Sequence, residues 1–176
     1  MPRVNTDLSK QIMAIKGANP EVIFAPGFYT TAAMVARAVK QQQIKAPLIG
    51  SDGWDTPNLL ELGGEALHGV YYANHFWVNS DDPLVRKFVG DYKAKYDLMP
   101  DALAATAYDG ARMLFDAIRR APSTESGQIR KALAQIKDFP GVTGRITLDP
   151  ERNADAPVYI LRVEDDGSLS LQESAK

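Results

Sequence analysis

Residues 48–57, with the sequence LIGSDGWDTP, join a short apolar run to a glycine-containing turn and then to a helix start. The apolar run predicts a short strand over residues 47–50, and the Thr56-Pro57 pair is typical of the first turn of a helix. In open α/β sheets, ligands bind just beyond the carboxyl ends of the strands. The turn that carries Asp52 and Trp54 is therefore the first candidate for a binding site.

The composition is that of a globular protein. The 176 residues are 45% hydrophobic and 24% charged, with a formal net charge of -2. Lysine and arginine do not gather into a basic stripe, which argues against a nucleic-acid partner. No apolar run approaches the ~18 residues that a membrane span requires, and the absence of cysteine excludes disulfides and thiolate sites.

Strands and helices alternate along the amino-terminal part of the chain. The pattern predicts a helix from Thr6 to Lys16, capped by Thr6 or Asp7, and a later helix capped by Thr30 or Thr31. Strands are predicted over residues 21–25, 47–50 and 69–74, with a short helix from Thr56 before the third strand. Three strands joined by helices predict a parallel sheet flanked by helices.

After Asn74 the pattern changes, and we expect the chain to enter a second lobe. A helix starting at Pro83 carries a stripe whose aromatic members we expect to lie in the core. The stripe consists of Leu84, Phe88, Tyr92 and Tyr96. A longer helix follows Asp101, a third covers residues 126–137, and a strand covers residues 142–148. The chain is predicted to end in a hairpin formed by residues 158–163 and 169–171.

Two interpretations of Asp52 stay open. Aspartate beside glycine often satisfies backbone N–H groups of its own turn. Alternatively, a carboxylate at a strand end, partly desolvated by Trp54, pairs with the ammonium group of a ligand. The aromatic residues Phe28 and Tyr29 follow another predicted strand, so their rings and the Trp54 indole are candidate walls of the same site.

The sequence offers no positive evidence for catalysis. His68 and His75 lack metal-ligand spacing, Ser51 does not match a nucleophile elbow, and no phosphate-binding glycine loop is present. We therefore expect no catalytic residue, no metal and no cofactor. An α/β enzyme that uses Asp52 and Asp55 as acid and base ranks last among the hypotheses.

Several motifs resemble the branched-chain amino-acid-binding proteins of ABC uptake systems, which are type I periplasmic solute-binding proteins. The order and spacing of these motifs carry the resemblance across nearly the whole chain. They are NPEVIF (19–24), PGFY (26–29), PLIGSDGW (47–54), GGEALHGVY (63–71), AYDGA (107–111) and FPGVTGRI (139–146).

The resemblance implies two α/β lobes, each a Rossmann-like or flavodoxin-like parallel sheet flanked by helices. Residues 1–74 and 156–176 would belong to the carboxyl-terminal lobe. Residues 75–155 would form a mainly helical part of the amino-terminal lobe, with hinge crossings near residues 74–80 and 149–157.

The resemblance also implies a function and a site. The chain would be an exported, periplasmic or extracellular solute-binding protein, with its signal peptide absent from this sequence, and it would bind a branched-chain or related amino acid without catalysis. Asp52 would hold the ligand ammonium, and Trp54, Phe28 and Tyr29 would line the pocket. Phe76, near a hinge crossing, would be a further ligand-binding residue. The alternative is a ligand-sensing regulatory domain of the same fold in a signalling or transcriptional protein.

The resemblance covers only the carboxyl-terminal half of such receptors. The helices between Asp82 and Lys137 would then lack most of their sheet and leave apolar faces uncovered. We expect association with the missing amino-terminal half or homodimerisation, and the full-length receptor would engage a membrane permease of an ABC transporter.

Overall fold

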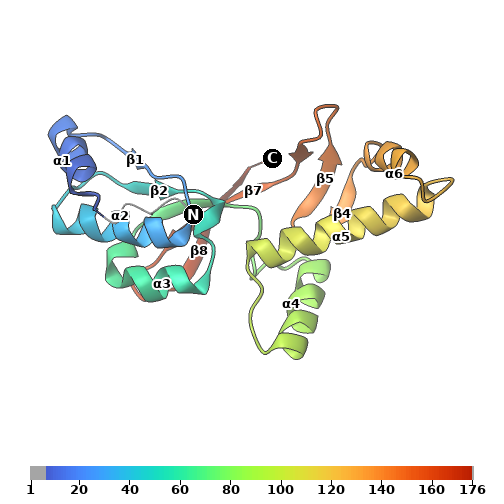
Figure 1. Cartoon of the computed structure of the whole chain (residues 1–176). Coiled ribbons are helices and arrows are strands. Elements are labelled where there is room, and N and C mark those ends of the chain that lie inside the picture. Colours follow the sequence, from blue (N-terminus) through green and yellow to red (C-terminus); the bar gives the residue numbers. More distant parts are fainter. Residues whose placement is uncertain (1–6, 176) are drawn as a thin grey trace. The chain divides into compact units, whose positions relative to one another are not determined.

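The computed structural model describes residues 7–175 (Figure 1). The chain divides into two compact units. The first contains the described residues up to Asn74 together with Ile160–Glu173, and the second contains His75–Tyr159 and residues 174–175.

A five-stranded sheet forms the centre of the first unit, with the strand order β1, β2, β3, β7, β8. The pairs β1–β2 and β2–β3 are parallel. These strands are β1 (Ile23–Phe24), β2 (Leu48–Gly50), β3 (Tyr71–Asn74), β7 (Val158–Val163) and β8 (Leu169–Ala175). The α/β architecture predicted from the alternation of apolar runs and helical periods is therefore confirmed.

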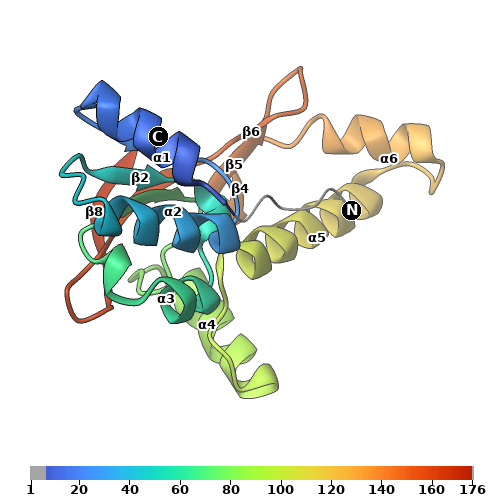
Figure 2. The same ribbon diagram turned by 60° about the vertical axis from the view of Figure 1, so that its left-hand side comes forward.

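Three helices accompany this sheet: α1 (Ser9–Ala18), α2 (Tyr29–Gln41) and α3 (Pro57–Gly63). Two short 3-10 helices flank α3 in the chain. The first, η1 (Asp52–Trp54), lies between β2 and α3, and the second, η2 (Gly64–Leu67), lies between α3 and β3. Helices α2 and α3 lie side by side (Figures 1 and 2). The buried face of α2 carries only short side chains, so the helix approaches its neighbours closely: Ala32, Ala33, Ala36 and Val39.

The helix starts predicted for the first unit have different outcomes, and the cap predicted for α2 was wrong. Helix α2 begins at Tyr29, and Phe28 is its N-cap without a side-chain hydrogen bond, so neither Thr30 nor Thr31 caps it. Helix α1 begins at Ser9, whose N–H donates to the Asp7 carboxylate at 3.0 Å, while the predicted start at Thr6 lies outside the described residues. Thr56 caps α3 by accepting a hydrogen bond from the N–H of Asn58 at 3.4 Å.

The second unit combines helices with a three-stranded antiparallel sheet of order β4, β5, β6. The helices α4 and α5 begin with aspartate caps, Asp82 and Asp101, which accept hydrogen bonds from backbone N–H groups of the first turn. Its elements are α4 (Pro83–Tyr96), α5 (Ala102–Arg120), α6 (Ser126–Leu133), β4 (Phe139–Gly141), β5 (Gly144–Leu148) and β6 (Ala154–Asp155). Helix α6 is shorter than predicted, and β4 was not predicted.

A buried carboxylate fixes the β4–β5 hairpin to helix α5. Asp109 is 1% exposed and accepts hydrogen bonds from the N–H of Val142 at 2.9 Å and from the N–H and hydroxyl of Thr143 at 2.8 and 2.9 Å. A side chain at Gly141 would meet the Asp109 carboxylate, because an added Cβ would lie 2.5 Å from Oδ2. The carboxylate therefore replaces the backbone partners that the hairpin turn lacks.

The core of the second unit lies where α4, α5 and the segment after β3 meet. Its buried members are Phe76, Val85, Phe88, Ala102, Ala105 and Val142. The predicted aromatic stripe of α4 is only partly core, because Phe88 is buried, Tyr92 is half-buried and Tyr96 is exposed.

One face of α5 is apolar and exposed. Its members recur at helical spacing and include no charged side chain; we call them the α5 stripe: Leu103, Ala107, Gly110, Leu114 and Ile118. The most exposed leucine of the stripe, Leu103, is 62% exposed. Helix α5 therefore uses one face for the core and the hairpin and leaves a second apolar face to solvent.

Candidate functional site

The site is built on two turns that leave the same edge of the first unit's sheet. Strands β1 and β2 run parallel, with Phe24 opposite Ile49, so the turns that follow them start side by side. The first turn leads through Gly27 and Phe28 into α2. The second leads through Ser51 into η1, which carries Asp52.

The two turns contact each other directly. The N–H of Gly27 donates to Ser51 Oγ at 3.3 Å, and the Ser51 hydroxyl donates back to the Gly27 carbonyl at 3.4 Å. An added Cβ at Gly53 would lie 2.6 Å from the same carbonyl oxygen, so a side chain there would force the turns apart. Glycine at position 53 is therefore required for this close approach.

Trp54 anchors the second turn from the inside. Its side chain is 0% exposed, and its indole covers the backbone of Gly50 so closely that an added Cβ there would lie 2.2 Å from Cδ2. Within the described residues, its indole N–H has no hydrogen-bond partner. The turn thus ends in a large buried apolar group that holds it against β2.

Asp55 is joined to the neighbouring strand β3. The Tyr72 hydroxyl donates to Asp55 Oδ1 at 3.2 Å, and Tyr72 is 2% exposed. Burial raises the pKa of the Tyr72 hydroxyl far above its ordinary value, and the negative charge of Asp55 raises it further. The cap of α3 is Thr56, so the Asp55 side chain is available to bind the tyrosine.

The predicted ligand-binding residues have different environments. Asp52 is exposed at the start of η1, Phe28 is 69% exposed on the facing turn, and Tyr29 is half-buried at the first position of α2. Trp54 is buried beneath the turn. Phe76 belongs to the second unit, where it is 2% exposed and packs edge-on against Phe88 at a centroid distance of 5.9 Å.

Ser51 and Tyr72 contribute to the site and were not predicted to do so. Ser51 was considered only as a nucleophile, although a small hydroxyl residue in a turn commonly bonds to nearby backbone. Tyr72 was considered only as a strand former. A buried tyrosine usually places its hydroxyl against a partner, and this tendency was the available signal.

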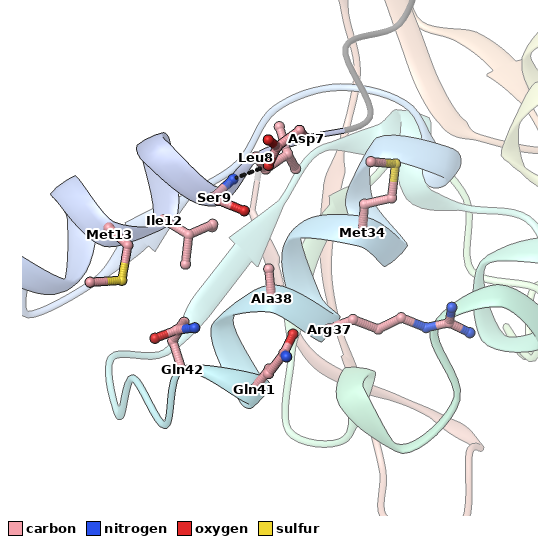
Figure 3. A pocket seen from close by; sticks show the side chains of 10 residues that line it. All are labelled: Asp7, Leu8, Ser9, Ile12, Met13, Met34, Arg37, Ala38, Gln41 and Gln42. Carbon is pink, nitrogen blue, oxygen red and sulfur yellow. Dashed lines mark hydrogen bonds between the residues drawn. The ribbon is translucent and has the colours of Figure 1, made fainter.

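A separate pocket of about 300 Å³ lies between α1 and α2 (Figure 3). Ile12 and Met13 line it from α1, and Met34 and Gln41 line it from α2. No residue of the two strand-end turns lines it. This pocket is therefore distinct from the candidate site.

Residues 7–175 show neither a metal-binding cluster nor a membrane-spanning helix. Between residues 7 and 175, no group of three or more histidine, aspartate or glutamate side chains is arranged to hold a metal ion. None of the helices in the same range combines the length and hydropathy that a bilayer crossing requires.

Comparison with known proteins identifies the family. A periplasmic binding protein family model matches residues 1–168, and the chain belongs to this family. The family consists of solute-binding proteins that do not catalyse reactions, and membership implies a periplasmic location.

Individual relatives agree with this assignment. The chain is 26% identical over 156 residues to Leu/Ile/Val-binding protein homolog 1 of Brucella abortus. Its fold matches the leucine binding protein LivK of Thermotoga maritima, with a TM-score of 0.90 and 31% identity, and LivJ of Streptococcus pneumoniae in complex with isoleucine, with a TM-score of 0.82 and 26% identity.

These matches cover most of this chain and about half of each relative. The alignments include 88% of this chain but 41% of the Brucella protein, and 99% of this chain but 50% of the Thermotoga structure and 49% of the Streptococcus structure. The chain therefore spans about half the length of the relatives that it matches.

Proposed function

We propose that the chain is part of the solute-binding component of an ABC uptake system and contributes to a site for a branched-chain or related amino acid. The observation that carries the proposal is the pair of interlocked turns at the sheet edge, one of which exposes Asp52 and the other the Phe28 ring. A carboxylate suits the ligand's ammonium group, and an aromatic ring suits both a cation and an aliphatic side chain. The names of relatives that bind leucine and isoleucine support this ligand class.

The roles of the aromatic residues follow from their exposure. Phe28 and Tyr29 are accessible at the first turn and would contact the ligand, while Trp54 would support the second turn from beneath. Direct ligand contact by Trp54 and by Phe76 remains a prediction. The ligand-carboxylate partner would lie in the half of the receptor that this chain does not span.

Calorimetry with L-leucine, L-isoleucine and L-valine tests the proposal, on this chain and on a longer receptor that contains it. Loss of one charge-assisted hydrogen bond is worth about 1.5–3 kcal/mol, so Asp52→Ala should weaken binding by roughly 10- to 150-fold. The matched control is Asp165→Ala, which removes an exposed carboxylate from the turn between β7 and β8. Equal affinity of Asp52→Ala and the parent protein would remove Asp52 from the site.

The α5 stripe supports a proposal about the partner. We propose that the remaining half of the receptor covers this stripe, because an uncharged helix face with exposed leucines needs an apolar surface opposite it. A groove of about 520 Å³ between α4 and α5 borders the stripe. Its lining combines aromatic residues with two charged ones and includes Phe88, Asp91, Tyr92, Lys95 and Tyr108. The intact receptor would then engage a membrane permease.

Sedimentation velocity on the isolated chain tests whether the α5 stripe is an association surface. Without its partner, the wild-type chain should self-associate at micromolar concentration, whereas Leu114→Glu should sediment as a monomer. The control Lys93→Glu changes an exposed charged residue of α4 outside the stripe. A stable wild-type monomer at these concentrations would contradict the proposal.

A further inference from the structure

The Asp52 turn has anchors on both sides. Towards β1, Ser51 and Gly53 contact the Gly27 turn, as described above. Towards β3, Asp55 accepts the hydrogen bond of Tyr72. The exposed residue Asp52 lies in sequence between these anchors, so both ends of its turn are attached to neighbouring strands.

The Tyr72 anchor is set by the sheet itself. Tyr72 pairs with Gly50 in the parallel register of β2 and β3, and Gly50 is the last residue of β2 before the Asp52 turn. The tyrosine ring is buried, so its hydroxyl has little freedom to move. The hydroxyl therefore offers a fixed donor at the far end of the turn.

Backbone hydrogen bonds transmit this anchor to Asp52. The N–H of Asp55 donates to the carbonyl of Asp52 at 3.1 Å, and the N–H of Trp54 donates to the carbonyl of Ser51 at 3.0 Å. These bonds make η1 a single closed turn. Fixing the Asp55 side chain thus restricts the backbone that carries the Asp52 carboxylate.

We propose that Tyr72 is a positioning residue, which acts through Asp55 to hold the Asp52 turn in its binding conformation before the ligand arrives. The inference rests on the proposed function of Asp52 as the ammonium partner. It assigns Asp55 the role of a hydrogen-bond acceptor and not that of a second ligand carboxylate. Preorganisation of this kind raises affinity because the ligand does not have to order the turn.

A ligand-free measurement separates this role from binding. The chain has two tryptophans, so Trp77→Phe leaves Trp54 as the reporter of the turn. In that background, Tyr72→Phe and Asp55→Ala should each raise acrylamide quenching of Trp54 severalfold, and the double variant should add little. Asp55→Asn should quench like the parent, because its amide oxygen still accepts the Tyr72 hydrogen bond.

Binding of L-leucine, measured by calorimetry on the same variants, supplies the second readout. Tyr72→Phe should weaken binding about three- to tenfold, which corresponds to one neutral hydrogen bond, while Asp55→Asn should bind like the parent. Unchanged quenching in Tyr72→Phe, or Asp55→Asn behaving like Asp55→Ala in either assay, would overturn the positioning role. Absence of leucine binding by the parent protein would count against the proposed function instead, and the quenching series would still decide the role of Tyr72.

Discussion

Removing the Asp109 carboxylate should selectively destabilise the second unit. Asp109→Ala deletes the acceptor of three hydrogen bonds from Val142 and Thr143. The Thr143 hydroxyl can rotate towards another acceptor, but the two backbone N–H groups are fixed by the hairpin. Each buried donor left without a partner costs about 1–3 kcal/mol.

The surroundings of Asp109 determine where in this range the loss falls. Asp109 lines a cavity of about 330 Å³, which is large enough to admit water to the vacated N–H groups. We therefore expect Asp109→Ala to lower the free energy of unfolding by about 3 kcal/mol, towards the lower end of the summed cost. Asp109→Asn keeps the volume but turns one acceptor into a donor, and it should cost about 2 kcal/mol.

Urea unfolding followed by circular dichroism measures the loss, and hydrogen exchange locates it at the Val142 and Thr143 amides. The control Asp116→Ala removes a carboxylate of the same helix that pairs with Arg120, and such an i,i+4 pair is worth only about 0.3–0.5 kcal/mol. A loss below about 1 kcal/mol for Asp109→Ala, with both amides still protected, would refute the role given to this carboxylate.

Three further outcomes are expected. Gly50→Ala should lower the melting temperature and cost about 1–3 kcal/mol, because its Cβ would overlap the Trp54 indole, whereas Gly90→Ala, with no atom within 4 Å of the added Cβ, should be neutral or stabilising. Asp82→Ala should cost about 1 kcal/mol in chemical denaturation, because it removes the side-chain cap of α4. The free energy of unfolding should fall as the pH rises above 10.0, the ordinary pKa of tyrosine, because Tyr72 loses its proton more readily in the unfolded chain than in the folded one. Urea titrations between about pH 9 and 11 measure this fall, and it should be shallower in Tyr72→Phe.

Patterns of local periodicity predicted most of the fold. Strands β1 and β2 were predicted from the apolar runs before Gly27 and Ser51, and the start of α4 was predicted from Pro83. These predictions succeeded because a strand, a turn and a helix start each have short-range signals. The β4–β5 hairpin was only half predicted. Strand β4 contains Pro140 and Gly141, which disfavour strands, and its stability depends on Asp109, which lies far away in the sequence.

The candidate site was predicted less completely than the fold. The sequence indicated the two strand-end turns, one with Phe28 and the other with Asp52, since a glycine turn after an apolar run marks a strand end. Tertiary packing decides whether an aromatic side chain points to solvent or to the core. The sequence therefore could not show that Trp54 is buried and Phe28 is exposed. The hydrogen bond between Tyr72 and Asp55 joins different strands, and no local pattern indicates such a pairing.

The alanine-rich face of α2 has a consequence for how new specificities arise. Helix α2 contacts η1 and begins at the Phe28–Tyr29 turn, so its position influences both turns of the site. Because Ala32 and Ala36 are buried and small, exchanging either for a bulkier residue would shift the helix axis and thus move the ring of Phe28 relative to Asp52. If the proposed site is the solute site, selection for a different solute would act on residues behind it while the residues proposed to face the solute stay the same.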